Sequence, residues 1–152
     1  MAEVISATGK CLCGAVGVTV KNINNSFSAC HCSICRKWGG GGPLMALDCG
    51  TDVSIEGEES ISVFDSSTWA ERGFCSNCGT HLFYRIKQNQ GYIIPIGLFD
   101  TKKVDDDQFD SEQFKFDLQI FIDEKPGYYC FSNATKLMTG AEVFAMYGPS
   151  DK

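Results

Sequence analysis

The sequence predicts a mainly β protein with few, short helices. Apolar residues alternate with polar or small residues over several short runs, which is the pattern of strands that bury one face. Sixteen glycines, together with many Asn, Asp and Ser residues, supply turns between these runs. Patterns typical of helices are scarce. We therefore expect sheets connected by tight turns.

The clearest strand lies between Phe114 and Ile122, where every second residue is apolar and positions 115, 117 and 119 are polar. Three valines give residues 16–20 the same alternation. Shorter strands are expected at Ile61–Phe64, His81–Ile86 and Tyr92–Phe99. Pro95 lacks an amide donor, so the last of these is expected to be an edge strand or to bend at Pro95.

Two short helices are expected. The first covers Cys32–Trp38 and is ended by Gly39–Gly42. The second covers Ser132–Met138, with Ser132 or Asn133 as its N-cap and Gly140 as its stop.

The size and charge of the chain limit its function. Its 152 residues are the usual size of one domain, so a single domain spanning 1–152 is expected. The net charge of −6 opposes binding to nucleic acid or to an anionic membrane surface. No apolar run approaches the roughly 20 residues that cross a bilayer. Residues 1–20 lack the apolar segment of a signal peptide, which favours a cytoplasmic location.

Cysteine is the most informative residue type in the chain. The nine cysteines are Cys11, Cys13, Cys30, Cys32, Cys35, Cys49, Cys75, Cys78 and Cys130. A disulfide framework fits poorly, because the number is odd and the cytosol is reducing. Cysteines separated by one or two residues in such a chain more often bind metal or carry out redox chemistry.

The first group combines Cys11 and Cys13 with Cys75 and Cys78. Residues i and i+2 of an extended segment point to the same side, so the first pair can face one ion. The second pair is a C-x2-C turn followed by Gly79, which permits a sharp exit. Four sulfurs complete the shell of a closed structural zinc site. The alternative is that one pair is redox-active or simply buried.

The second group places Cys30, Cys32 and Cys35 within six residues. Three ligands leave one tetrahedral position open, as a catalytic zinc requires. An all-sulfur set is soft, so a substrate thiolate is the natural fourth ligand. Three alternatives stay open: His31 closes the site, Cys49 or Cys130 closes it from elsewhere, or the thiols are redox-active and hold no metal.

Three cations lie close to the cysteine motifs in the sequence. Arg36 and Lys37 follow Cys35, and Arg72 precedes Cys75 by three residues. Such side chains can bind the carboxylates of a thiol-bearing peptide. They can equally offset thiolate charge or lie in solvent. His81 is expected to pack rather than to catalyse.

Four segments together resemble one family. Gly9–Gly14 resembles an opening G-x-C-x-C-G motif, and Cys30–Lys37 resembles a C-H-C-x-x-C-R-K core. Residues 66–84 resemble the block S-S…R-x-F-C-x-x-C-G-T-x-L, and Ile120–Lys125 resembles a later strand. On these motifs the chain is identified as a compact member of the glutathione-dependent formaldehyde-activating enzyme family, which includes the domain of centromere protein V.

The resemblance implies a mostly antiparallel, Mss4-like β fold with two zinc ions. Position by position, it implies that the structural zinc is held by Cys11, Cys13, Cys75 and Cys78, and that the catalytic zinc is held by Cys30, Cys32 and Cys35. The implied activity is that of a carbon–sulfur lyase, which interconverts S-hydroxymethylglutathione with formaldehyde and glutathione.

Two functional hypotheses follow. In the first, the chain is a zinc-dependent enzyme that takes a small thiol, with glutathione as the expected partner, and Arg36, Lys37 and Arg72 contact the substrate. In the second, it is a non-catalytic, zinc-stapled β module that binds a protein partner. An open, exchangeable metal position distinguishes the enzyme from the module.

Overall fold

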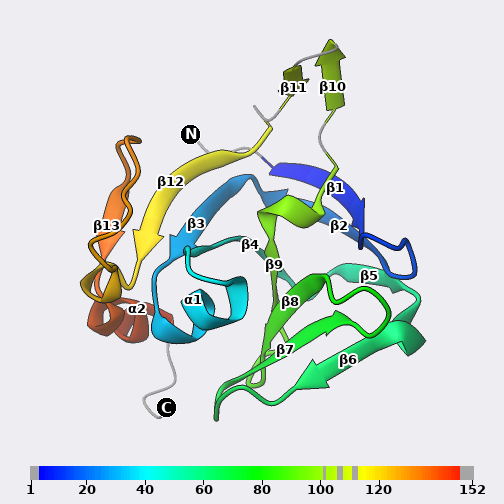
Figure 1. Ribbon diagram of the computed structural model, residues 1–152, viewed down its shortest axis with the longest axis horizontal. Coiled ribbons are helices and arrows are strands. Elements are labelled where there is room, and N and C mark those ends of the chain that lie inside the picture. The colour runs from blue at the N-terminus through cyan, green and yellow to red at the C-terminus, as the bar shows by residue number, and fades with distance from the viewer. Residues whose placement is uncertain (1–3, 101, 106–107, 111–112, 148–152) are drawn as a thin grey trace.

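In the computed structural model, the chain folds into β-sheets with two short α-helices, as the sequence predicts (Figure 1). The structure describes residues 4–100, 102–105, 108–110 and 113–147. The strands are β1 Val4–Lys10, β2 Gly17–Asn24, β3 Ser26–Cys30, β4 Leu44–Gly50, β5 Val53–Glu56, β6 Ile61–Phe64, β7 Ala70–Cys75, β8 His81–Ile86, β9 Tyr92–Pro95, β10 Lys102–Asp105, β11 Gln108–Asp110, β12 Lys115–Ile120 and β13 Lys136–Met138. The helices are α1 Ser33–Gly39 and α2 Gly140–Tyr147, with 3-10 turns η1 Glu58–Ser60, η2 Ile96–Leu98 and η3 Ile122–Glu124.

The main sheet has eight strands in the order β13-β12-β3-β4-β9-β8-β7-β6 (Figure 1). Strand β12 pairs in parallel with both β3 and β13, and every other pairing in this sheet is antiparallel. A second sheet, β1-β2-β5, is antiparallel, and β10 and β11 form a hairpin. The expectation of a mainly β, mostly antiparallel fold is therefore confirmed, and the parallel pairings of β12 add to it.

The main sheet buries a different core on each face. On β4, Leu47 and Cys49 join the core that includes the valines of β2, between the two sheets. Leu44 and Ala46 alternate with them and pack in a second core with Cys30 and Cys35. Because side chains alternate across a strand, the two cores lie on opposite faces of the main sheet.

Most of the expected strands are confirmed. Strands β6 and β8 have the expected bounds, and the strand expected at 114–122 appears as β12. The chain does bend at Pro95, where β9 ends and η2 begins. Strand β9 is not an edge, because it lies between β4 and β8. Its pairing with β8 stops at Ile93, so the missing donor of Pro95 breaks no bond there.

The first helix is confirmed and the second is wrong. Cys32 is the N-cap of α1, and Gly40 ends it in the left-handed conformation, with φ of 97°. The expected helix Ser132–Met138 is absent, since residues 136–138 form β13 beside β12. Gly140, expected as a stop, instead begins α2. Among the described residues, no helix is long and apolar enough to cross a membrane.

A capping box at Thr139 explains where α2 begins. The Thr139 hydroxyl accepts from the Glu142 amide at 3.2 Å, and the Glu142 carboxylate accepts from the Thr139 amide at 3.0 Å. These bonds satisfy two donors near the start of the helix. The T-x-x-E pattern of residues 139–142 was present in the sequence and marks this start, so Gly140 lies at the beginning of a helix and not at its end.

Gly9 marks the closest approach between β1 and η2. A Cβ atom at Gly9 would lie 2.0 Å from the carbonyl oxygen of Leu98. Gly9 also forms an isolated bridge with Phe99. The first glycine of the G-x-C-x-C-G motif is thus explained by backbone packing just before Cys11.

We predict that Gly9→Ala lowers the free energy of unfolding by about 1–3 kcal/mol, because the added methyl group overpacks a backbone contact. Gly17→Ala, in the same sheet, is the matched control: its Cβ would meet no heavy atom closer than 3.9 Å. Its stability should change by about 0.5 kcal/mol or less. Urea denaturation measures both, and equal effects would show that the Leu98 contact is not the cause.

Candidate metal centres

Four cysteines meet where the β1–β2 turn touches the β7–β8 turn. The four sulfurs, from Cys11, Cys13, Cys75 and Cys78, lie within 4.8 Å of one another. Two of the separations are 3.6 Å (Cys11 to Cys13) and 3.7 Å (Cys13 to Cys75). A tetrahedron with zinc–sulfur bonds of about 2.3 Å has edges of about 3.8 Å, whereas a disulfide is about 2.0 Å long. The cluster therefore fits a tetrahedral metal ion rather than disulfides.

The two turns that carry these cysteines have the same construction. Gly14 and Gly79 follow the second cysteine of each pair, with φ of 80° and 79°. The Gly14 amide donates to the Cys11 carbonyl at 3.0 Å, and the Gly79 amide donates to that of Cys75 at 2.8 Å. Each glycine supplies the left-handed conformation that folds a turn around its sulfurs. The paired Cys/Gly spacing in the sequence reflects this geometry.

Thr80 ties the two turns together. Its hydroxyl accepts from the Leu12 amide at 3.1 Å and lies 3.2 Å from the Cys78 sulfur. The hydrogen bond with Thr80, followed by backbone hydrogen bonds, lowers the pKa of Cys78 to about 5. The thiolate is the form that binds metal, so this environment favours a ligand.

Three cysteines form the second cluster, on the opposite face of the main sheet. Cys30 ends β3, Cys32 caps α1 and Cys35 lies in the first turn of that helix. Their sulfurs lie within 4.8 Å of one another. Hydrogen bonds from Cys30 and Cys35 lower the pKa of Cys32. Hydrogen bonds with Cys32 and Cys35, followed by burial, raise the pKa of Cys30. The three thiols thus gather around one favoured thiolate and can hold a metal ion together.

No other Cys, His, Asp or Glu within the described residues joins the three sulfurs. His31 is fully buried and its ring is occupied, with Tyr129 Oη 2.7 Å from Nδ1 and Gln119 Oε1 2.8 Å from Nε2. Burial also lowers the pKa of His31, which favours the neutral ring. Cys49 packs in the core on the opposite face, and Cys130 is exposed. The cluster therefore presents three ligands and no fourth one from the described residues.

The three candidate cations lie in different environments. Arg72 is only 4% exposed, and its Nη2 lies 3.6 Å from the Cys35 sulfur. Lys37 is exposed and lines the same cavity as Arg72, which has a volume of about 280 Å³. Arg36 donates from Nε to the His31 carbonyl at 2.9 Å. Arg72 is thus the cation in direct contact with the three-cysteine cluster.

Two aromatic residues that the sequence analysis missed hold Arg72 in place. The Arg72 Cζ lies 4.8 Å from the ring centroid of Trp38 and 5.1 Å from that of Tyr84. Trp38 also stacks on His81, with centroids 4.1 Å apart, so His81 packs as expected. The spacing of Cys35 and Trp38 in α1 could have indicated a shared face. Tyr84 is found only from the register, in which it pairs with Arg72.

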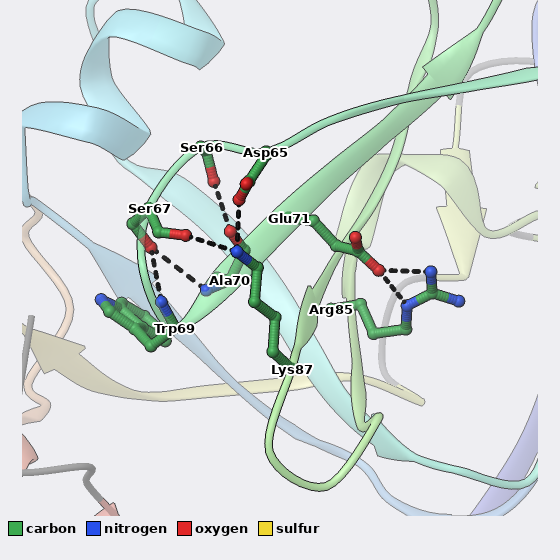
Figure 2. Close-up of polar contacts among 8 residues, drawn as sticks. All are labelled: Asp65, Ser66, Ser67, Trp69, Ala70, Glu71, Arg85 and Lys87. Atoms are coloured by element: carbon green, nitrogen blue, oxygen red, sulfur yellow. Dashed lines mark hydrogen bonds and ion pairs between the residues drawn. The ribbon is translucent and has the colours of Figure 1, made fainter.

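The loop that leads into β7 is pinned by side-chain hydrogen bonds (Figure 2). Ser66 donates to the Ala70 carbonyl at 3.1 Å, and the Ser67 hydroxyl accepts from the Trp69 and Ala70 amides. Lys87 donates to the Ser67 carbonyl and pairs with Asp65. Because Ser66 also lines the cavity beside Arg72, the two serines of the motif fix one wall of that cavity.

Comparisons with known proteins point to one family. The model of the glutathione-dependent formaldehyde-activating enzyme family matches residues 6–124. An uncharacterized lyase of Schizosaccharomyces pombe is 37% identical over 136 residues, which cover 89% of this chain and 92% of that protein. A Halomonas elongata protein, whose name assigns it provisionally to the formaldehyde-activating enzymes, is 37% identical over 83 residues, covering 49% and 53%.

A solved structure shows the same fold. The crystal structure of a Rhodobacter sphaeroides protein superposes with a TM-score of 0.53 and 25% identity, covering 64% of this chain and 91% of that one. The extent of the family match and the similarity to the Schizosaccharomyces pombe protein lead to one conclusion. The chain belongs to the family of glutathione-dependent formaldehyde-activating enzymes.

Proposed function

We propose that the chain is a zinc-dependent carbon–sulfur lyase that makes and breaks adducts of a small thiol with an aldehyde. The leading substrate is S-hydroxymethylglutathione, formed from formaldehyde and glutathione. The observation that carries this proposal is the three-sulfur cluster of Cys30, Cys32 and Cys35, which has no fourth ligand among the described residues and is in contact with the guanidinium of Arg72. Membership of the family supports the same chemistry.

The donor set of this cluster suits zinc and a thiol. Three thiolates and one divalent zinc ion carry a net charge of −1, which the Arg72 guanidinium balances. Soft sulfur donors favour a further sulfur ligand over water. When bound, zinc supplies stabilisation of a substrate thiolate at neutral pH. Lys37, exposed beside the cavity, and Arg36 on the same helix are placed to attract substrate carboxylates.

We assign a structural role to the second zinc ion, held by Cys11, Cys13, Cys75 and Cys78. Four sulfurs leave no open position, and two of these residues belong to the core between the sheets. This ion joins turns that lie far apart in the chain, so its binding contributes to folding. The protein therefore needs two zinc ions, one for the fold and one for chemistry.

The alternative function, a protein-binding module without catalysis, is less well supported. A structural scaffold needs only the four-sulfur cluster. It gives no reason to bury Arg72 against a second, three-sulfur cluster, since burying a charge without full pairing is costly. The incomplete cluster and the buried arginine together favour an enzyme.

We predict about two zinc ions per chain, and different consequences when each cluster is broken. Cys75→Ala should cause aggregation or a large fall in melting temperature, because the four-sulfur site is coupled to folding. Cys32→Ala should stay folded and lose about one zinc ion. Elemental analysis and thermal denaturation measure both, and Cys130→Ala, at an exposed cysteine, is the control. A folded wild type without zinc would refute both sites.

A thiol should enter the open side of the three-cysteine cluster. In the cobalt-substituted protein, titration with glutathione should change the absorption band that Cys32→Ala removes and leave the four-sulfur band unchanged. An unchanged spectrum at millimolar glutathione would mean that the site is already closed, and would favour the protein-binding module.

The lyase activity should appear as accelerated exchange between formaldehyde and S-hydroxymethylglutathione, which NMR exchange spectroscopy measures without a coupled assay. The wild type should raise the exchange rate above the spontaneous rate. Cys32→Ala should return it to the spontaneous rate, because the thiolate is then no longer stabilised. A zinc-loaded wild type that leaves the rate unchanged with every thiol tested would refute the proposed function.

A further inference from the structure

Arg72 is a buried guanidinium with an incomplete set of hydrogen bonds. Its Nη2 contacts the Cys35 sulfur, but Nε and Nη1 are buried and have no hydrogen-bond partner within the described residues. Trp38 and Tyr84 pack near the guanidinium and supply no acceptor there. A buried donor without an acceptor is destabilising, more so for a charged group. A side chain kept in this state indicates an acceptor that arrives with a ligand.

The cavity beside Arg72 is open to such a ligand. It has a volume of about 280 Å³ and is lined by Ile34, Lys37, Trp38, Phe64, Ser66 and Arg72. Ile34, Lys37 and Phe64 are exposed, so the cavity reaches the surface, while Arg72 lies in its buried part. A ligand that enters here therefore meets the exposed ammonium of Lys37 and the buried guanidinium of Arg72.

The contact with Cys35 decides which part of the substrate Arg72 meets. A thiol that supplies the fourth ligand of the proposed metal ion places its sulfur beside those of Cys30, Cys32 and Cys35. In a thiol–aldehyde adduct, the oxygen that came from the aldehyde is two covalent bonds from that sulfur. The carboxylates of a glutathione adduct are many bonds further away, within reach of the exposed Lys37. A donor group fixed against a cluster sulfur therefore suits the near oxygen.

We propose that Arg72 is a catalytic residue that binds the aldehyde-derived oxygen of the adduct and stabilises the negative charge that develops on it. The proposal rests on the proposed function and goes beyond it, because it assigns Arg72 to the reacting atoms rather than to a substrate carboxylate. A preorganised, permanently charged donor in a buried position stabilises an oxyanion strongly. The packing by Trp38 and Tyr84 fixes the guanidinium before the substrate arrives.

The step is balanced without a further reactant. In the cleavage direction, the adduct hydroxyl gives its proton to solvent water while Arg72 stabilises the oxygen. An electron pair on that oxygen then forms the carbonyl double bond, and the carbon–sulfur bond breaks with its electron pair on sulfur. Addition follows the same path in reverse, and nothing is oxidised or reduced.

The first test measures binding and not turnover. The cobalt-substituted protein is titrated with mercaptoacetate, which carries anionic oxygens close to its sulfur, and with 2-mercaptoethanol, which is neutral. The wild type should bind mercaptoacetate at least about tenfold more tightly, as charge-assisted hydrogen bonds predict. Arg72→Gln should remove this preference and retain the affinity for 2-mercaptoethanol. A preference that survives in a folded Arg72→Gln protein would overturn the proposal.

The second test measures exchange rates with two thiols, glutathione and 2-mercaptoethanol. Arg72→Gln should lower the saturated rate by about 100-fold or more with both thiols, as for the loss of an oxyanion donor. A loss seen only with glutathione would overturn the proposal, since it would place Arg72 on a carboxylate. If the wild type shows no activity, the proposed function fails. The binding test then still decides whether Arg72 contacts an oxygen close to the thiol sulfur.

The matched control is Arg85→Gln, which removes an arginine from the opposite face of the same strand pair. Arg85 pairs with Glu71, as Figure 2 shows, and also donates to the Tyr92 hydroxyl at 3.0 Å. The exchange rates of Arg85→Gln should stay within about twofold of wild type, because Arg85 lies on the face of the sheet opposite Arg72 and the three-cysteine cluster. Zinc content and melting temperature are measured for each variant. If Arg72→Gln does not fold, Arg72→Lys is tested in its place. The fall in its exchange rate should again be equal for both thiols.

Discussion

The structure depends on bringing the β1–β2 and β7–β8 turns together at the four-cysteine cluster. The sulfurs of Cys13 and Cys75 lie 3.7 Å apart although 62 positions separate them in the chain. Closing so long a loop costs conformational entropy, and the proposed ion, which would contact both turns, would offset that cost. Gly14 and Gly79 allow both turns to wrap the sulfurs, and Thr80 links the turns directly. The same contact fixes the end of β7 and the start of β8.

Strand β7 connects the four-cysteine cluster to the three-cysteine cluster. Cys75 belongs to the core between the two sheets, whereas Arg72, three residues earlier, reaches Cys35 on the opposite face. An odd step along a strand reverses the direction of the side chain. The four-cysteine cluster holds the end of β7 and thereby fixes the position of Arg72. A single strand thus carries a residue of one cluster and a residue in contact with the other, on opposite faces of the sheet.

Local patterns allowed the sequence to predict much of this arrangement. Both cysteine clusters were predicted from spacing, and α1 was predicted because the glycines at 39–42 end the pattern that begins at Cys32. The helix expected at Ser132–Met138 failed because pairing with β12 outweighed local preference there. Arg72 was named as a candidate, but its burial between Trp38 and Tyr84 depends on strand register and on how α1 packs. Such long-range contacts are not encoded in the spacing of residues along one segment.

We infer that the two clusters are separate zinc sites on opposite faces of the main sheet. Anomalous diffraction at the zinc edge, from crystals of the zinc-loaded protein grown under reducing conditions, tests it most directly. We expect two peaks, one among four sulfurs and one among three, each about 2.3 Å from its sulfurs. A single peak in the four-sulfur cluster, with a disulfide among Cys30, Cys32 and Cys35, would contradict it.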